Sequence, residues 1–276
     1  MHAIVFSLAL ATVPFSYFHH EVIVSVKVGA SGPYNFLLDT DTTPSAIDSA
    51  LAQRLRLRPN GPSGLASGVG TRKSVVFALR IPDLSVGSVH AKNLLALTSD
   101  LSGLSKHFGH RIDGVLGTSF LAGRVTEFNY PCRTIAFLSD APVAPITASF
   151  HGDDENVVDN ARVNGRRATA TFDTGNGGPI LVTGKGIADL DLAAAAKRGR
   201  QGVGYGYNGG AKNSAGRLND VRVGAIDFGT STATFMSSAQ GSYDINIGNR
   251  AMQRYRVVFD YVRHLITFLA PASCGP

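Results

Sequence analysis

Two Asp-Thr pairs are the residues of this chain that are best placed to do chemistry. Asp39-Thr40 ends the apolar run of residues 36–38, and Asp173-Thr174 ends the alternating segment of residues 168–172. A buried strand that carries an acid at its tip needs compensation, because an unpaired buried charge costs several kcal/mol. Each acid therefore predicts a partner, and the other acid is the candidate.

The second half of the chain repeats the first half around these acids. The segments "VKVGASGPYNFLLDTDTT" and "ARVNGRRATATFDTGNGG" share an alternating strand, a Gly turn, a second strand and Asp-Thr. Asp39 precedes Gly117 by 78 positions and Asp173 precedes Gly248 by 75, and the final strands of the two halves keep this offset of three. A repeat in register predicts two lobes with approximate two-fold symmetry, in which the two acids face each other.

Two facing carboxyl groups have a specific chemistry. When they lie about 3 Å apart they cannot both ionise, so they share one proton. The charged member can take a proton from a water that attacks a carbonyl carbon, while the neutral member donates to the carbonyl oxygen. The pair thus predicts amide hydrolysis without a metal, thiol or serine. A single Asp-Thr pair is equally typical of a turn or a helix cap, but two pairs in register after apolar strands make this interpretation the weaker one.

The composition predicts a soluble, turn-rich globular protein. Hydrophobic residues make up 44% of the 276 residues, charged residues make up 17%, and there are 31 glycines. The net charge of +6 comes mostly from dispersed arginines, which favours a solvated surface over nucleic-acid binding. Beyond the N-terminus no segment is apolar for long enough to span a membrane, so we expect no stable membrane insertion.

Other candidate sites are weaker than the acid pair. His19-His20 and the pair His107 and His110 lack a third ligand at a suggestive spacing, so we expect no metal site. The glycine-rich segment 202–210 lacks the strand-to-helix context and the Lys-Ser/Thr of a phosphate-binding loop. We interpret it as a flap of the second lobe or a surface hairpin, and we expect no cofactor.

Periodicity predicts a mostly β chain with a few short helices. Alternating residues from Val22 to Val28 and the apolar run before Asp39 form a predicted hairpin. Ser45 and Asp48 resemble a capping box that begins a helix in residues 47–57. Residues 189–200 are a second predicted helix, with basic residues at its C-terminal end. The acidic, Pro-containing segment 141–156 is the predicted linker between a first lobe at 13–140 and a second lobe at 157–270.

Taken together, these segments resemble the pepsin/retropepsin class of aspartic peptidases, more specifically the bacterial aspartyl protease family proteins that carry a retropepsin-like unit twice. The resemblance rests on "FLLDT", "DGVLGTSFL", "TFDTGNGGP" and "INIGNRAMQRYRVVFDY" and covers residues 13–269. It implies a mostly β, two-lobed pepsin-like acid protease fold with pseudo-two-fold symmetric, β-barrel-like lobes. It also implies a monomeric aspartic endopeptidase that binds a peptide or an unfolded protein in the cleft between its lobes.

The resemblance also implies roles for individual residues. Asp39 and Asp173 would be the catalytic dyad, Thr40 and Thr174 would hydrogen-bond across the lobe interface beneath it, and Gly175 would support the second loop. Two apolar-apolar-Gly segments would buttress the loops: Val115, Leu116 and Gly117 in the first lobe, and Asn246, Ile247 and Gly248 in the second. Gly-rich hairpins would cover the cleft as flaps, with the first-lobe flap within residues 61–77.

Asp41 departs from the family pattern, which has Gly at this position, whereas Gly175 is kept in the second lobe. A carboxylate that points at the acid pair would raise its pKa values, but we expect Asp41 to point to solvent, where an unpaired charge costs least. In either orientation we expect an Asp41→Gly change to raise the rate. The alternative function is a catalytically impaired pseudo-protease or peptide-binding protein, and a structural role unrelated to the cleft is a third.

The two cysteines and the N-terminus bear on the compartment. Termini of pepsin-like lobes meet beneath the cleft, so a bridge between Cys132 and Cys274 is one expectation and two free thiols are the other. The apolar core at residues 3–11 has no preceding Lys or Arg. It is either an incomplete secretory signal, which predicts a periplasmic or secreted protein, or an ordinary first strand.

Overall fold

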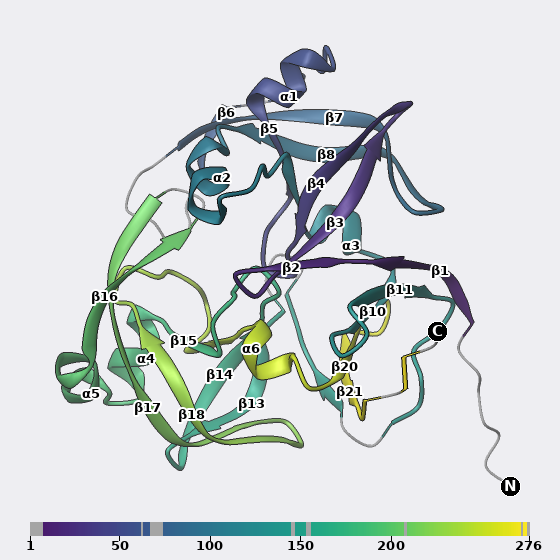
Figure 1. Cartoon of the computed structure of the whole chain (residues 1–276). Helices are drawn as coiled ribbons and strands as arrows, with labels where there is room; N and C mark the ends of the chain where they lie inside the picture. The colour runs from purple at the N-terminus through teal and green to yellow at the C-terminus, as the bar shows by residue number, and fades with distance from the viewer. Residues whose placement is uncertain are drawn as a thin grey trace, which may run out of the picture.

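The computed structural model describes residues 8–61, 63–66, 74–144, 147–152, 156–206, 209–271 and 273–274. Within these residues the fold is mostly β, with 54% strand and 13% helix in six short helices. Two barrel-like sheets form the lobes, and a third sheet joins them (Figure 1). The predicted fold class, a mostly β and two-lobed pepsin-like fold, is confirmed.

The first lobe is an eight-stranded sheet that curls back on itself. Its strand order is β2-β3-β4-β9-β5-β8-β7-β6, and an additional pairing between β3 and β7 closes the curl. The strands are β2 (Ser16–Phe18), β3 (Glu21–Val28), β4 (Ser31–Leu38), β5 (Ser45–Asp48), β6 (Ser63–Ala66), β7 (Ser74–Val86), β8 (Val89–Ser99) and β9 (Gly114–Leu116). The connections carry α1 (Ser49–Arg54), α2 (Ser102–Phe108) and α3 (Thr118–Leu121).

The second lobe repeats this topology in seven strands. Its order is β13-β14-β19-β15-β18-β17-β16, and a pairing between β13 and β17 closes it in the same way. The strands are β13 (Val158–Val163), β14 (Arg166–Phe172), β15 (Ile180–Val182), β16 (Arg200–Gly206), β17 (Gly209–Val223), β18 (Ile226–Phe235) and β19 (Ile245–Ile247), with helices α4 (Gly184–Asp189), α5 (Ala193–Arg198) and α6 (Asn249–Met252). Each strand takes the place of its counterpart in the first lobe, counted from β3. The sequence repeat is therefore a structural repeat.

A six-stranded sheet in the order β1-β11-β10-β20-β21-β12 joins the lobes. Its strands are β1 (Ala9–Pro14), β10 (Val125–Asn129), β11 (Thr134–Leu138), β12 (Thr147–Ser149), β20 (Arg256–Asp260) and β21 (Leu265–Leu269). The central strands β10 and β20 run antiparallel, and there the Arg256 guanidinium donates two hydrogen bonds to the buried Glu127 carboxylate at 2.9 and 2.8 Å. Both halves of the chain thus share one sheet, and the lobe bounds 13–140 and 157–270 stay a prediction.

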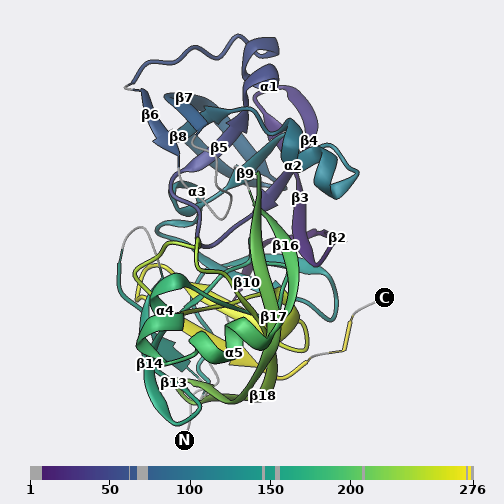
Figure 2. The same ribbon diagram turned by 90° about the vertical axis from the view of Figure 1, so that its left-hand side faces the viewer.

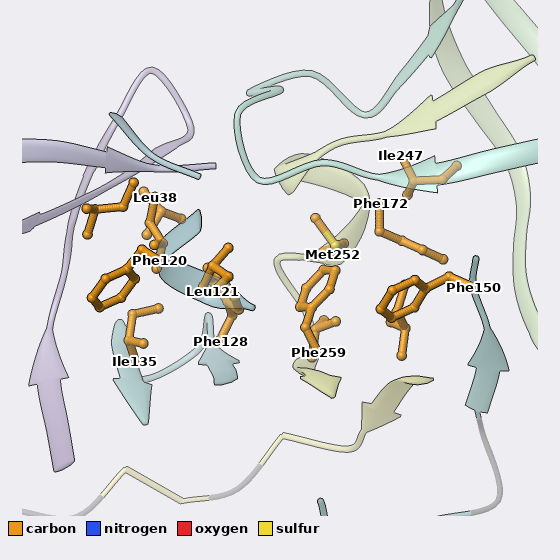
Figure 3. Packing of buried hydrophobic residues seen from close by; sticks show 14 of the residues in the cluster. Leu38, Phe120, Leu121, Phe128, Ile135, Phe150, Phe172, Ile247, Met252 and Phe259 are labelled. Atoms are coloured by element: carbon orange, nitrogen blue, oxygen red, sulfur yellow. The ribbon is translucent and has the colours of Figure 1, made fainter. Parts of the chain in front are cut away.

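Apolar side chains from both lobes and from the joining sheet form one continuous core. Alternation along β4 directs Phe36 and Leu38 into this core and Leu37 to the opposite face. Phe172 ends β14 in the equivalent place. Figure 3 shows the two halves of the core facing each other, with Leu38, Phe120, Leu121, Ile135 and Phe128 on one side and Ile247, Phe172, Met252, Phe259 and Phe150 on the other.

Two helix predictions are corrected by the structure. Ser45 to Asp48 is strand β5 and not a capping box, and the helix α1 begins after it, with the Asp48 carboxylate accepting from the Leu51 N–H at 3.1 Å. Ser45 and Asp48 lie at the two ends of this short strand, and their spacing is the same as that of the two polar residues of a capping box. The single helix expected at 189–200 is divided between α4 and α5, because Asp191 adopts a left-handed backbone with φ of 57° that ends the first helix.

A disulfide bond joins Cys132 to Cys274 across 142 residues of chain, as the first of the two cysteine expectations predicted. Cys132 follows β10 in the joining sheet, so the bridge ties the C-terminal tail to that sheet. The apolar residues 9–14 form β1, which pairs with β11. Residues 3–7 of the same apolar segment lie outside the described residues.

Both predicted flap segments contain hairpins. The first-lobe segment 61–77 includes β6 paired with the start of β7, and its residues 67–73 lie outside the described residues. The second-lobe segment 202–210 belongs to the β16–β17 hairpin, whose residues 207–208 are likewise outside them. This hairpin extends from the second lobe toward the first (Figure 2). There the Tyr205 ring stacks on His107 of α2, with ring centroids 4.6 Å apart.

Candidate active site

Two equivalent strand ends deliver Asp39 and Asp173 to the lobe interface. The Asp39 N–H donates to the Leu116 carbonyl at 2.9 Å, and the Asp173 N–H donates to the Ile247 carbonyl at 2.9 Å. These bonds continue the parallel pairings of β4 with β9 and of β14 with β19. Each acid therefore sits where a central buried strand ends, which is the position that the sequence repeat predicted.

The two carboxyl groups lie close together, on either side of Gly175: its N–H donates to Asp173 at 2.6 Å, and a Cβ on it would lie 2.2 Å from the Asp39 carboxylate. Burial raises the pKa of Asp39, and burial together with the neighbouring Asp39 charge raises the pKa of Asp173 well above its usual range. Two carboxyl groups this close to each other cannot both ionise, so the arrangement favours one proton shared by the pair.

Donors from its own loop hold the Asp39 carboxylate. The Asp41 N–H donates to Oδ1 at 2.9 Å, and the Thr42 hydroxyl donates to Oδ2 at 2.6 Å. The Asp173 carboxyl accepts from the Gly175 N–H at 2.6 Å and from the Asn246 side-chain amide at 2.6 Å. The last donor comes from β19 rather than from the Asp173 loop itself.

Thr40 and Thr174 exchange hydrogen bonds across the lobe interface and are both fully buried. Each threonine hydroxyl accepts from the other's backbone N–H, at 3.0 and 3.1 Å. The Thr40 hydroxyl also donates to the Phe172 carbonyl at 2.7 Å, and the Thr174 hydroxyl donates to the Leu38 carbonyl at 2.6 Å. This reciprocal arrangement fixes the two acid loops relative to each other.

The glycines of the site allow close backbone approaches. A Cβ on Gly117 would lie 2.1 Å from the Thr42 carbonyl oxygen, and one on Gly248 would lie 2.3 Å from the Gly178 oxygen. A Cβ on Gly175 would lie 2.2 Å from the Asp39 carboxylate. The segments Val115, Leu116, Gly117 and Asn246, Ile247, Gly248 thus lie directly against the acid loops, and Gly175 touches the first acid.

Asp41 does not point to solvent, which contradicts the orientation expected from the sequence. Its carboxylate crosses the lobe interface, where the Tyr243 hydroxyl donates to Oδ2 at 2.6 Å and the Thr171 hydroxyl contacts Oδ1 at 3.4 Å. The argument from solvation alone failed because hydroxyl donors of the other lobe replace water. Asp41 is half-buried, and a carboxylate with hydrogen-bonding partners no longer costs what an unpaired buried charge does.

Two residues near the site, Tyr243 and Glu21, were missed by sequence analysis. Tyr243 precedes β19 and is 5% exposed. The one hint in the sequence was that this position of the repeat holds a tyrosine in the second lobe and Ile112 in the first. Glu21 begins β3, and its Oε1 accepts from the Gly177 N–H at 2.8 Å. Burial raises the pKa of Glu21 well above its usual range, as do the charges of the acid pair.

A second pair of equivalent acids anchors the strands beside the loops. Asp113 accepts from the Asn35 N–H at 3.0 Å in the first lobe, and Asp244 accepts from the Thr169 N–H at 2.8 Å in the second. The signal for this pair was in the sequence, because both acids occupy one position of the repeat, four residues before Gly117 and Gly248. Their role is to fix strand register.

The histidines lie close together without forming a metal site. His19 and His107 have ring centroids 5.7 Å apart, and His110 stacks on Phe18. Within the part of the chain that the structure describes, no group of three or more His, Cys, Asp or Glu residues could hold a metal ion. The helices of this part are all too short or too polar to cross a membrane.

Comparison with known proteins gives one match. Residues 24–120 match the model of the aspartyl protease family, which spans the first lobe from β3 to α3. No curated protein matches the sequence. The matched segment contains Asp39, its loop and the β9 strand against which that loop packs. This match covers the first lobe alone and supports an aspartyl protease domain there.

Proposed function

We propose that the chain is an aspartic endopeptidase that hydrolyses peptide bonds with a water activated by Asp39 and Asp173. The observation that carries this proposal is the close approach of two carboxyl groups at equivalent strand ends, one on each side of Gly175. The match of residues 24–120 to the aspartyl protease family supports a peptidase. The substrate is a peptide or an unfolded protein, because an extended chain can lie between two lobes and pair with hairpin edges.

The shared proton sets the order of events. With the proton on Asp173, Asp39 takes a proton from water while the water oxygen bonds to the peptide carbonyl carbon, and Asp173 gives its proton to the carbonyl oxygen. In the second step Asp39 returns a proton to the amide nitrogen, the C–N bond breaks, and Asp173 recovers a proton from the hydroxyl. Two protons move in each step, and no metal or covalent intermediate takes part.

The working compartment is part of the proposal. A disulfide between Cys132 and Cys274 supports a periplasmic or secreted protein, because such bonds persist in oxidising compartments. The protein would act as a monomer, since the lobes pair within one chain and each supplies one acid.

The proposal is tested by digestion of a peptide library from about pH 3 to pH 7, with a statine-type transition-state mimic as inhibitor. Asp39→Asn and Asp173→Asn should each lower kcat by roughly 10² to 10⁴-fold, the usual contribution of a positioned acid or base. The matched control is Asp227→Asn, an exposed acid in β18 next to the β17–β18 turn, which should cleave at the wild-type rate.

The alternative is a peptide-binding protein without hydrolysis, which Asp41 in place of the motif Gly would favour. Tight binding of the statine-type mimic to a wild type that cleaves no peptide would support this alternative. Failure to bind the mimic and failure to cleave would remove both functions.

A further inference from the structure

Four positions of the two lobes differ together around the acid pair. In the first lobe Leu37, Ile112 and Val115 are apolar and pack against Leu104 and Phe108 of α2. Their second-lobe counterparts in the repeat are Thr171, Tyr243 and Asn246, which are all polar and at most 5% exposed. The fourth position holds Asp41 in the first lobe and Gly175 in the second. The polar residues therefore lie in the second lobe and the additional acid, Asp41, lies in the first. Asp41 contacts Tyr243 and Thr171 across the lobe interface.

Hydrogen bonds connect these polar residues in one line from Asp41 to Asp173. The Tyr243 hydroxyl donates to Asp41 Oδ2 at 2.6 Å. The Asn246 amide lies 3.5 Å from the Tyr243 oxygen and donates to Asp173 Oδ2 at 2.6 Å. A buried tyrosine beside a carboxylate keeps its proton, since burial and the Asp41 charge raise the pKa of Tyr243. Its oxygen lone pairs therefore remain available to face Asn246.

Asn176 fixes the direction of the Asn246 amide. The Gly178 N–H can only donate, and it does so to Asn176 Oδ1 at 2.8 Å, which leaves the Asn176 amide nitrogen to face Asn246. This nitrogen donates to Asn246 Oδ1 at 2.7 Å. The Asn246 nitrogen must then face Asp173 and Tyr243. Each polar group in the line has one defined role as donor or acceptor.

We propose that Asp41 and Tyr243 are positioning residues that hold the Asn246 amide on Asp173 across the lobe interface. This inference rests on the proposed peptidase function and refines it. Asp41 is then part of the working site, and its replacement by Gly lowers activity. The first-lobe acid receives two donors from its own loop, the Asp41 N–H and the Thr42 hydroxyl, whereas the second acid receives the Gly175 N–H from its loop and its other donor from this line.

The decisive variant is Tyr243→Phe, which removes one oxygen atom and no charge. It should lower kcat/KM by about tenfold, as expected when a charged group's hydrogen-bond donor is loosened. Removing a donor from a carboxylate disfavours its charged form, so the upper pKa of the pair rises and the basic limb of the pH-rate profile moves to higher pH. Tyr255→Phe, whose ring packs on Phe268 away from the acids, is the matched control.

Asp41 variants separate hydrogen bonding from charge. Asp41→Asn keeps an oxygen that accepts from Tyr243 and should retain activity within about twofold. Asp41→Gly should lose about as much as Tyr243→Phe, and the double variant should lose little more than either, since both break the same line. Equal rates in Asp41→Gly and wild type, or independent losses that multiply in the double variant, would overturn the proposal.

A measurement without activity keeps the test independent of the proposed function. NMR titration of the aspartate side-chain carboxyl carbons should show the upper titration of the acid pair moving to higher pH in Tyr243→Phe and staying in place in Tyr255→Phe. Coinciding titrations in wild type and Tyr243→Phe would overturn the line of hydrogen bonds. A wild type that cleaves no peptide but shows the shift would overturn only the peptidase function.

Discussion

The Asp39 loop of the first lobe and the Asp173 loop of the second share one backbone frame but have different surroundings. In both loops the acid donates its N–H to a neighbouring strand carbonyl at 2.9 Å, and a threonine crosses to the other lobe. The side chains beside the two loops differ. Those beside the Asp39 loop belong to an apolar cluster that includes Leu104 and Phe108 of α2, whereas Asn246 beside the Asp173 loop donates a hydrogen bond to Asp173. A symmetric fold thus presents two chemically different carboxyl groups.

This difference matters because identical surroundings give a shared proton no preferred residue, whereas unlike surroundings do. Here both donors to the Asp39 carboxylate come from its own loop, whereas Asp173 accepts from its loop and also from the Asn246 amide. The repeated backbone therefore positions the two acids, and the side chains that differ between the lobes set the chemical environment of each acid.

The largest effect expected in this comparison comes from Gly175→Ala. The added Cβ would lie 2.2 Å from the Asp39 carboxylate, so the acid must move, although the same position of the first lobe accommodates Asp41. We expect kcat to fall by about 10²-fold, because a misplacement of 1 Å at the reacting groups can cost that much. Peptide cleavage at fixed pH measures it.

The control for this variant is Gly103→Ala in α2, where nothing lies within 4 Å of the added Cβ. It should leave cleavage unchanged and stabilise the helix slightly, since Ala is the better helix former. A Gly175→Ala protein as active as this control would show that Asp39 has room to move, and would weaken the case for a closely held acid pair.

An intermediate effect is expected where the two lobes are alike. Thr40→Val and Thr174→Val each remove a buried hydroxyl that accepts one hydrogen bond and donates another. Each change should lower the free energy of unfolding by about 2 to 4 kcal/mol, because a buried donor and a buried acceptor are left unpaired. Denaturant unfolding measures both values, and they should agree within about 1 kcal/mol.

The double variant sharpens this result. If the threonines act as one reciprocal unit, the double change should cost less than the two single changes added together. Strictly additive losses would mean that the two threonines act independently. A loss at only one of the two positions would mean that the two lobes are not equivalent at this interface.

The sequence predicted the parts of the site that follow from the repeat. Asp39, Asp173 and the threonines after them lie in register behind apolar strands, so the duplication alone placed them face to face. The contact between Asp41 and Tyr243 joins residues 202 positions apart in different repeats, and neither residue has a local pattern that signals the other. Solvation favoured an exposed Asp41, and only the packed interface shows the donors that replace water.

Local sequence patterns gave wrong helix predictions where the same residue types are typical of two different structures. Ser45 and Asp48 bound a short strand, but Ser and Asp with this spacing also begin helices, and only pairing of β5 with β8 and β9 decides the matter. Residues 189–200 have the composition of one helix, yet Asp191 interrupts it with a left-handed residue that Asp tolerates. Tertiary pairing and single backbone angles were the missing information.

The smallest effect expected concerns Glu21, a third buried acid beside the Asp173 loop. Its Oε1 accepts from the Gly177 N–H, and its Oε2 has no hydrogen-bonding partner among the described residues. Burial and the charges of the acid pair raise its pKa above the ordinary value of 4.5. The folded protein therefore holds a proton that the unfolded chain releases above about pH 4.5. Stability should fall as the pH rises from there toward the folded-state pKa.

Glu21→Gln removes this titration while keeping an oxygen for Gly177. The variant and wild type should unfold with similar free energies near pH 4, where Glu21 is protonated in both states. Near pH 7 the variant should be more stable by on the order of 1 kcal/mol, because it pays no cost for keeping a charge buried. Urea unfolding at the two pH values gives the comparison. If the free energies of unfolding of the two proteins changed with pH by the same amount, Glu21 would titrate alike in the folded and unfolded states. The buried acids with raised pKa values at this site would then be Asp39 and Asp173, without Glu21.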